Sequence, residues 1–336
     1  MKNFLFFKSY KETDSNENEL YSLDHALLNL NVQSLWLNMG YWKHTQDYVQ
    51  ANKNLADLLY DQIPTHINNA TLIDFGFGCG DQILHYINSR SIEIYVGVTN
   101  EKSQYTIATK LLDQNLNDNL KQSKPIVKLF NGNSTDIQSW KNQHGKYYTD
   151  LVSENRVNLN LQHFSKFLPY LEQFDIVLSL DACYHFDTRE NFLKIAFDLL
   201  KPGGYIAITD LILGFDSQKN AFNSVFLNLI AKLTNIPKAN LINQDEYEIL
   251  FKKIGFTNLK LLDITDHVFK GLVKNCSNQT KNFKTGFKIN FLKNPPLDNE
   301  IPIDWFKYEH ILPKIFNYLD TKKVFRFFVV SAQKPT

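Results

Sequence analysis

The chain has 336 residues, of which 43% are hydrophobic and 21% charged, and its 36 Lys and Arg nearly balance its 35 Asp and Glu. This length suits one large or two ordinary domains, and the composition excludes a chain that is disordered throughout. The even charge gives no support to a nucleic-acid partner. The three cysteines, Cys79, Cys183 and Cys276, are too far apart for a disulfide framework or a C-x-x-C metal site.

Membrane and export signals are also missing from the sequence. No apolar run approaches the roughly 20 residues that cross a bilayer, and the apolar stretch at residues 4–7 is too short for a signal peptide. We therefore expect a cytoplasmic protein without stable membrane insertion and without a bound metal. The sequence leaves the oligomeric state open.

The first part of the chain favours helices. Apolar residues suit a helix over 20–38, and a second helix is expected over 52–63, ending before Pro64. From residue 71 on, short apolar runs typical of buried strands alternate with helical patterns. Strands are expected at 71–75, 92–98, 126–130, 174–180 and 205–213, and helices at 81–89, 102–112 and 190–200.

This alternation predicts an α/β fold with right-handed βαβ units, in which helices cover both faces of a mostly parallel sheet. Two further strands, at 259–264 and 324–330, would bring the sheet to seven. Long connections in such domains are usually functional covers. The long connections here are 135–173, 215–255, with helical patterning at 221–233 and 245–254, and 267–322.

A glycine-rich loop follows the strand expected at 71–75. It reads Asp74-Phe75-Gly76-Phe77-Gly78-Cys79-Gly80 and opens the next helix. Glycines allow a sharp turn and the close approach of a ligand, although such a loop can also be a tight turn without a ligand. A dinucleotide-binding G-x-G-x-x-G would need its third glycine at position 81, which is Asp.

The pattern D-x-G-x-G-x-G resembles the first motif of the class I S-adenosylmethionine-dependent methyltransferases, and Asp74, Gly76, Gly78 and Gly80 match it in full. Residues 174–179 resemble the family's fourth-strand motif, and residues 199–205, with Pro-Gly-Gly, resemble the turn before its fifth strand. The resemblance implies a Rossmann-like seven-stranded sheet with helical cap insertions. It also implies three regions, namely an N-terminal helical cover at 1–69, an S-adenosylmethionine-binding core at 70–213, and cap insertions with the closing strands at 214–336.

The resemblance also implies cofactor contacts. Gly76 and Gly78 would underlie the methionine part of S-adenosylmethionine. The carboxylate that usually ends the second strand is missing, and residues 97–104 instead resemble a branch that includes cyclopropane fatty-acid synthases and small-molecule methyltransferases. In that branch Thr99 and Gln104 would face the ribose, although Gln104 can also be read as a surface residue.

Two further segments carry cofactor assignments by the same resemblance. Asn133 and Ser134 occupy the place of the family's adenine contact, without its charge. Tyr41 and Trp42 resemble an H-x-G-Y-W motif whose aromatic pair packs over the methionine end of the cofactor. The alternative for this pair is plain core packing at a helix break.

The candidate catalytic residues follow two neighbouring strands. His185 comes just after the fourth strand and has a pKa suited to a general base, and Asp210, expected near the end of the fifth strand, would orient its imidazole. His185 can also be read as a wall residue. Asp181 would meet an amine substrate or the ammonium group of the cofactor, whereas Cys183 has no base placed to activate it.

A third candidate lies in residues 263–268, which resemble a D-I-T-x-H-V segment of the same branch. There a sixth strand runs into a substrate-covering helix, so His267 would face the site, although a lone histidine is more often structural. We therefore expect a methyltransferase (EC 2.1.1) that uses S-adenosylmethionine to methylate a hydroxyl or amine of a small or lipid-like molecule. The alternatives are a cyclopropane-synthase-like lipid enzyme and a non-catalytic cofactor-binding partner subunit.

Overall fold

The computed structural model describes residues 34–117, 125–150, 173–214, 231, 235–278, 321 and 323–336. Apart from residue 231, the helix expected at 221–233 lies outside the described residues, and so does most of that expected at 20–38. Residues 34–38 are described and are not helical, so the expected end of that first helix is wrong. Here the backbone N–H groups of Leu35 and Met39 donate to the carboxylates of Asp81 and Asp181 instead of to carbonyls of a helical turn.

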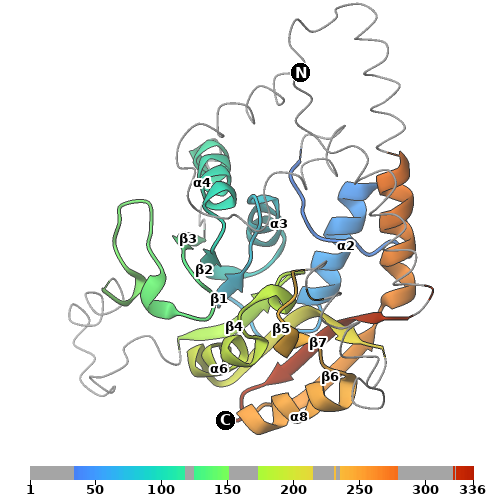
Figure 1. Cartoon of the computed structure of the whole chain (residues 1–336). Coiled ribbons are helices and arrows are strands. Elements are labelled where there is room, and N and C mark those ends of the chain that lie inside the picture. The colour runs from blue at the N-terminus through green and yellow to red at the C-terminus, as the bar shows by residue number, and fades with distance from the viewer. Residues whose placement is uncertain are drawn as a thin grey trace, which may run out of the picture.

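A single seven-stranded sheet runs through the molecule in the order β3-β2-β1-β4-β5-β7-β6 (Figure 1). The first five strands in this order are parallel, and β7 is antiparallel to both of its neighbours, β5 and β6. This confirms the seven-stranded, mostly parallel sheet. The strands are β1 (Ala70–Phe75), β2 (Ile92–Thr99), β3 (Ile126–Asn131), β4 (Phe174–Ser179), β5 (Leu200–Leu213), β6 (Thr257–Asp263) and β7 (Phe325–Gln333).

Helices cover both faces of the sheet, as expected (Figure 1). One face carries α2 (Tyr48–Tyr60), α3 (Asp81–Ser89) and α4 (Lys102–Asn117), and the other carries α6 (Arg189–Leu199) and α8 (Gln244–Ile254). Residues 269–278 form a further helix, beside α2. Short 3₁₀ turns are η2 (Ile137–Ser139), η3 (Cys183–His185), η5 (Lys238–Asn240) and η6 (Thr265–His267).

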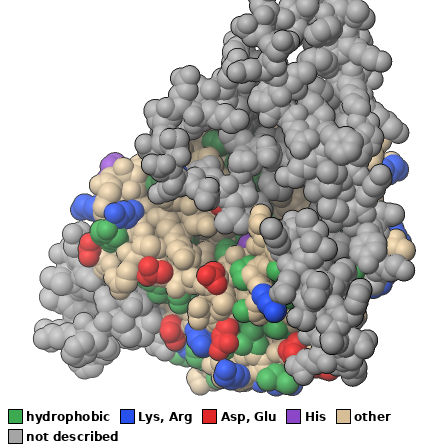
Figure 2. All heavy atoms as spheres, viewed as in Figure 1, with side chains coloured by type: hydrophobic (Ala, Val, Ile, Leu, Met, Phe, Trp, Pro, Cys, Tyr) green, Lys and Arg blue, Asp and Glu red, His purple; other side chains and the backbone are tan. Residues whose placement is uncertain are grey.

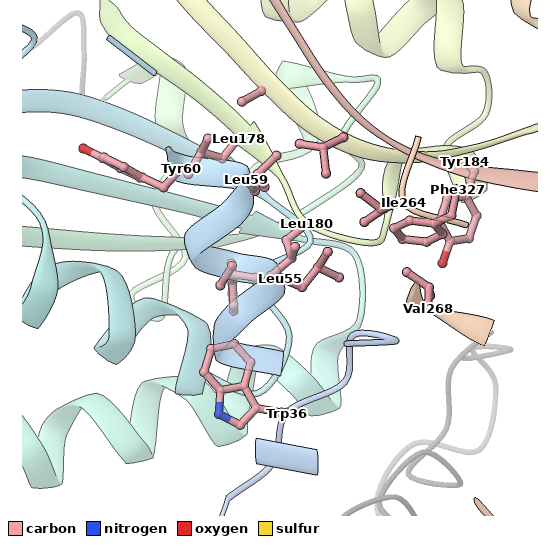
Figure 3. Packing of buried hydrophobic residues seen from close by; sticks show 14 of the residues in the cluster. Trp36, Leu55, Leu59, Tyr60, Leu178, Leu180, Tyr184, Ile264, Val268 and Phe327 are labelled. Atoms are coloured by element: carbon pink, nitrogen blue, oxygen red, sulfur yellow. The ribbon is translucent and has the colours of Figure 1, made fainter. Parts of the chain in front are cut away.

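The helix α2 begins four residues earlier than its apolar pattern indicates and ends before Pro64. Asp47 caps it, because its carboxylate accepts a hydrogen bond from the Gln50 backbone N–H at 2.7 Å. Its fully buried leucines, Leu55 and Leu59, point toward the sheet in Figure 3. Each buried leucine stabilises the fold by roughly 1.5–3 kcal/mol, so this helix fixes the segment that precedes it.

The strand β5 starts directly after α6, at Leu200, rather than after a separate turn at Pro202 and the two glycines. Leu200 pairs with Phe174 and Tyr205 pairs with Ile176, so the register shifts between these pairs. Gly203 lies within the irregularity with φ +79°, a conformation that glycine adopts without strain. The Pro-Gly-Gly sequence therefore makes a bulge within β5.

The strand order reverses between the neighbours β1 and β4, because the chain passes from β3, at one edge of the sheet, to β4 in the other half. In open α/β sheets, ligands bind outside the carboxyl ends of the strands at such a switch point. The glycine-rich loop follows β1 and the turn η3 follows β4, so both lie at this edge of the sheet.

Candidate functional site

The three glycines after β1 all have left-handed backbone conformations, with φ of +83° at Gly76, +65° at Gly78 and +107° at Gly80. A side chain at Gly76 would lie 2.5 Å from the Ala182 Cβ, and one at Gly80 would lie 3.0 Å from the Ala108 Cα. Both positions therefore need glycine for packing. At Gly78 the nearest atom would be a methyl carbon of Leu37 at 3.7 Å, an ordinary contact, so at this position the positive φ rather than packing favours glycine.

Asp74 is fully buried below this loop. Its Oδ2 accepts hydrogen bonds from the Gln82 amide at 2.5 Å and from the Tyr95 hydroxyl. Its Oδ1 is buried and has no hydrogen-bond partner in the described structure. Burial raises the pKa of Asp74 to about 6, against the effect of these two hydrogen bonds. An unsatisfied buried acceptor beside the glycine loop suits a ligand that carries hydrogen-bond donors or positive charge.

The residues expected at the ribose lie at the end of β2 and the start of α4. Thr99 is buried, its hydroxyl accepts from the Glu101 backbone N–H at 3.3 Å, and its carbonyl accepts from the Gly132 N–H at 2.9 Å. Gln104 is half-buried, and in the described structure its amide has no hydrogen-bond partner. Gln104 thus has its full hydrogen-bonding capacity available for a ligand, whereas Thr99 also joins β2 to the loop after β3.

The residues expected at the adenine lie in that loop after β3. Asn133 is exposed, and its side-chain oxygen accepts from the N–H and the hydroxyl of Thr135 at 2.9 and 2.8 Å. Only its amide nitrogen remains for an adenine contact. Ser134 is buried. Both residues stay predictions as adenine contacts.

The segment before α2 crosses over the glycine loop. The Leu35 N–H donates to the Asp81 carboxylate at 2.9 Å, and the Met39 N–H donates to the Asp181 carboxylate at 2.6 Å. Between these two anchors, Leu37 lies against Gly78. Two carboxylates that follow different strands therefore fix one covering segment over the glycine loop.

Tyr41 and Trp42 end this segment and join it to the residues after β6. The Trp42 N–H donates to the His267 carbonyl at 2.8 Å, and the indole packs directly on Gly271. The Tyr41 ring meets the His267 ring edge to face at 5.6 Å between centroids. Trp42 therefore packs against the helix at 269–278, and a contact of either aromatic residue with the cofactor stays a prediction.

Asp181 follows β4 in a left-handed conformation, with φ +58°. Its carboxylate accepts from the Met39 N–H and from the Tyr184 hydroxyl at 2.6 Å, and its own N–H donates to the Thr209 hydroxyl at 2.7 Å. Burial raises the pKa of Asp181 to about 6, with a smaller contribution from the charge of Asp210. Asp181 thus joins the covering segment to β4 and β5.

His185 lies in η3 at the same edge of the sheet and is half-buried. Its Nδ1 is 3.2 Å from the Asn235 backbone carbonyl, and its ring contacts the ring of Tyr184, with 4.2 Å between centroids and 55° between the ring planes. A carbonyl oxygen can only accept, so this contact requires a proton on Nδ1 and leaves Nε2 as the basic nitrogen of the neutral ring.

These features place a glycine loop, a buried carboxylate and a histidine at one edge of the sheet. A model of the methyltransferase domain family matches residues 41–261, about two thirds of the chain. The protein is a member of this methyltransferase family. The match covers the glycine loop and His185 but ends before His267.

Among curated relatives, the erythromycin 3''-O-methyltransferase of Saccharopolyspora erythraea is 26% identical over 261 residues, which are 75% of this chain and 71% of the relative. Two solved structures share the fold of this methyltransferase across 94% of its length. The [4+2]-cyclase SpnF has a TM-score of 0.62 at 15% identity, with 94% of its chain covered. The mycolic acid cyclopropane synthase CmaA1, complexed with SAH and CTAB, has a TM-score of 0.63 at 14% identity, with 95% covered.

The predicted pairing of Asp210 with His185 is wrong. Asp210 is fully buried, and its two oxygens lie 2.7 and 2.8 Å from the guanidinium of Arg189, while the Tyr247 hydroxyl donates at 2.8 Å. The physical reason is that β5 continues to Leu213, so Asp210 lies within the strand. Adjacent strand residues point to opposite faces, and Asp210 points toward α6 and α8 rather than toward the site.

Sequence reasoning missed the residue that holds the flanks of His185. The buried Asn240 donates from its amide to the carbonyls of Tyr184 and Phe186 at 2.9 and 2.7 Å, and its amide oxygen accepts from the Arg189 N–H at 2.8 Å. No motif marks this asparagine, because its partners lie more than 50 residues away in the chain. The methyltransferase thus fixes its candidate base from a distant loop.

The described part of the methyltransferase holds no group of three or more His, Cys, Asp or Glu that could bind a metal. None of the helices within the described ranges is long and apolar enough to cross a membrane. Its three cysteines are free and buried.

Proposed function

We propose that this protein transfers the methyl group of S-adenosylmethionine to a hydroxyl group of a small or lipid-like molecule. The observation that carries the proposal is the position of His185. It lies at the carboxyl edge of the sheet beside an intact glycine loop, with Nδ1 on a backbone carbonyl. The named relative is an O-methyltransferase, which supports an oxygen acceptor.

The residues around the glycine loop fit S-adenosylmethionine, which supplies a methyl group activated by a positive sulfur. Gly78 has no side chain that would obstruct the methionine part, and the buried Asp74 offers an acceptor and a potential negative charge. Gln104 offers its amide to the ribose, beside Thr99. The cyclopropane synthase CmaA1, which has the same fold, was solved in complex with SAH, the demethylated cofactor.

His185 supplies the base that an oxygen acceptor requires. A hydroxyl is a weak nucleophile, so it has to lose its proton as it attacks the methyl carbon. The Asn235 carbonyl selects the tautomer with a basic Nε2, which takes that proton, while the tilted contact with the Tyr184 ring limits rotation of the imidazole. Asn240 holds the backbone on both sides of His185 in place.

Asp181 provides a carboxylate near this base. Its carboxylate holds the Tyr184 hydroxyl and the covering segment, so it orders both walls of the site at once. We further propose a cytoplasmic location, because three free buried thiols suit a reducing compartment.

The test is methyl transfer with and without the imidazole. Radiolabelled S-adenosylmethionine is incubated with a panel of hydroxylated glycosides, phenols and fatty alcohols, each paired with its amine analogue, and turnover is measured for the parent and for His185→Ala. We expect turnover on the hydroxyl acceptor to fall by about 10²–10⁴-fold, the usual range for a positioned acid–base group, with unchanged cofactor affinity.

The matched control is His144→Ala, because His144 is exposed in the loop after β3. It should leave turnover unchanged. Parent-like rates in His185→Ala would remove His185 from the mechanism and favour an amine acceptor, for which alignment alone suffices. Cofactor binding without turnover on any acceptor would point to a partner subunit instead.

A further inference from the structure

A second recessed site lies outside the edge of the sheet described above. A cleft of about 280 Å³ separates residues 42–46, which precede α2, from the helix formed by residues 269–278. His267 and Trp42 lie in its wall, together with Lys43, Lys270 and Lys274. None of the catalytic or cofactor roles proposed so far needs these lysines.

The cleft concentrates positive charge. Lys43 and Lys270 are exposed and form no ion pair in the described structure, and Lys274 donates to the Gln46 amide oxygen at 2.9 Å rather than to a carboxylate. The single acidic residue of the described lining, Asp266, is 2.9 Å from the ammonium of Lys323. The hydrogen bond and charge of Lys323 lower the pKa of Asp266, with a smaller contribution from the charge of Lys270.

The described surface over α6 and α8 has a different charge pattern. Figure 2 shows acidic and basic side chains interspersed over the part of the surface where α6 and α8 lie. There Glu190 lies within ion-pair distance of both Lys194 and Lys253. In a chain whose overall charge is only +1, three lysines around one cleft are a local concentration that an anion would neutralise.

Asn275 is a second and independent indication of a ligand. It lines the cleft, is only 8% exposed, and its amide nitrogen is buried without any hydrogen-bond partner in the described structure. A buried donor left unsatisfied costs roughly 1–3 kcal/mol. A ligand oxygen in the cleft would satisfy the Asn275 amide after a small side-chain movement.

The two walls of the cleft also contact each other, and contacts formed before binding lower its cost. The Trp42 indole packs directly on Gly271, where a Cβ would lie 2.1 Å from the indole Cγ. The backbone of Trp42 is hydrogen-bonded to the His267 carbonyl, and Lys274 bridges to Gln46 on the facing wall. Both sides of the cleft are therefore positioned before any ligand arrives.

We propose that this cleft is an oxyanion site that recognises a phosphate or carboxylate group, with Lys270, Lys274 and Asn275 as its principal donors and Lys43 as a further cation. The group can belong to a free anion or to the acceptor itself. Binding of the acceptor's own anionic group rests on the proposed function, because the cleft would then hold the acceptor beside the segment that covers the glycine loop.

The first experiment measures binding of inorganic pyrophosphate by calorimetric titration at low ionic strength, with and without SAH. We expect saturable binding to the parent and at least tenfold weaker binding to the double variant Lys270→Gln/Lys274→Gln. Asn275→Asp, which keeps the side-chain shape and adds repulsion, should also weaken binding. The control is Lys252→Gln/Lys260→Gln, an equal charge change at exposed positions on α8 and β6, which should bind like the parent.

Absence of saturable binding, or equal weakening in the control, would overturn the proposal. Because this arm needs no methyl transfer, it stands even if SAH does not bind and the proposed function fails. The second arm compares acceptors with and without a phosphate or carboxylate. The site belongs to the acceptor if Lys270→Gln/Lys274→Gln raises the KM for the anionic acceptor alone and leaves kcat unchanged. It binds a free anion if the KM for both acceptors is unchanged.

Discussion

Replacing Asp210 by Asn should lower the free energy of unfolding of the protein and leave methyl transfer by the folded protein intact. The substitution keeps the shape of the side chain and removes its charge. Arg189 is 1% exposed and Asp210 is fully buried, so the guanidinium would be left in the core without its counter-ion. Burial opposes the charge of Arg189, but the charge of Asp210 outweighs it and raises the pKa of the guanidinium above its usual value.

The size of the effect follows from this geometry. Removing one partner of a buried ion pair costs about 3–5 kcal/mol, because the remaining charge has lost its compensation. That is a large fraction of the roughly 5–15 kcal/mol that stabilises a typical protein. Removing both charges, in Arg189→Met/Asp210→Leu, should cost less than Asp210→Asn alone, although the Tyr247 hydroxyl then loses its acceptor.

The measurement is urea unfolding followed by fluorescence, with methyl transfer measured on the folded fraction. Asp113→Asn, an exposed change on α4, serves as the control and should shift stability by less than about 0.5 kcal/mol. The stability role of this ion pair is refuted if Asp210→Asn unfolds at the same urea concentration as the parent but loses turnover. The ion pair would then contribute nothing to stability, and the expected functional pairing of Asp210 with His185 would be favoured again.

Three further outcomes can be checked. Gly78→Val should abolish S-adenosylmethionine binding, because a branched residue at φ +65° is strained and its side chain would occupy the position proposed for the methionine part. Normal binding by calorimetry would show that the loop is only a turn. Asp74, with a pKa of about 6, favours its neutral form in the folded protein, so its contribution to stability falls by up to about 3 kcal/mol as pH rises from about 4 to 6. The positively charged cofactor favours the ionised form of Asp74, so the affinity for S-adenosylmethionine should increase between pH 5 and 7.5. Asp74→Asn should remove that increase. Gly271→Ala should lower the midpoint of thermal unfolding. A Cβ at this position would lie 2.1 Å from the Trp42 indole, and such overpacking costs about 1–3 kcal/mol, more than the roughly 1 kcal/mol that Ala gains over Gly in a helix. A raised midpoint would show that the indole moves freely.

Most strands were predictable because they are apolar runs separated by helices, although most residues of the edge strands β3 and β6 are exposed or half-buried. All seven expected strands are present, and the helix at 81–89 agrees at both ends. The other observed strand and helix ends differ from the expected ends by a few residues, because the ends depend on caps and bulges. The cap at Asp47 and the bulge around Gly203 are set by local hydrogen bonds and backbone angles that apolar spacing does not report.

The site was predictable only in part. The motif at 74–80 is continuous in sequence, so its backbone geometry could be expected from its glycines. The error at Asp210 arose because the direction of a side chain depends on where its strand ends, and β5 runs to Leu213. Asn240 and Asn235 were invisible because they act across more than 45 residues through backbone carbonyls and side-chain amides.

The place of β7 in the sheet has a consequence for how the chain matures during synthesis. β7 lies between β5 and β6, yet roughly 110 residues separate the end of β5 from its start. At a synthesis rate of about 5–20 residues per second, the β5 edge waits roughly 6–20 s for its partner. An unpaired edge rich in Ile and Leu is prone to wrong pairing, so chaperone demand should peak in this interval and a ribosome stall within it should produce aggregates.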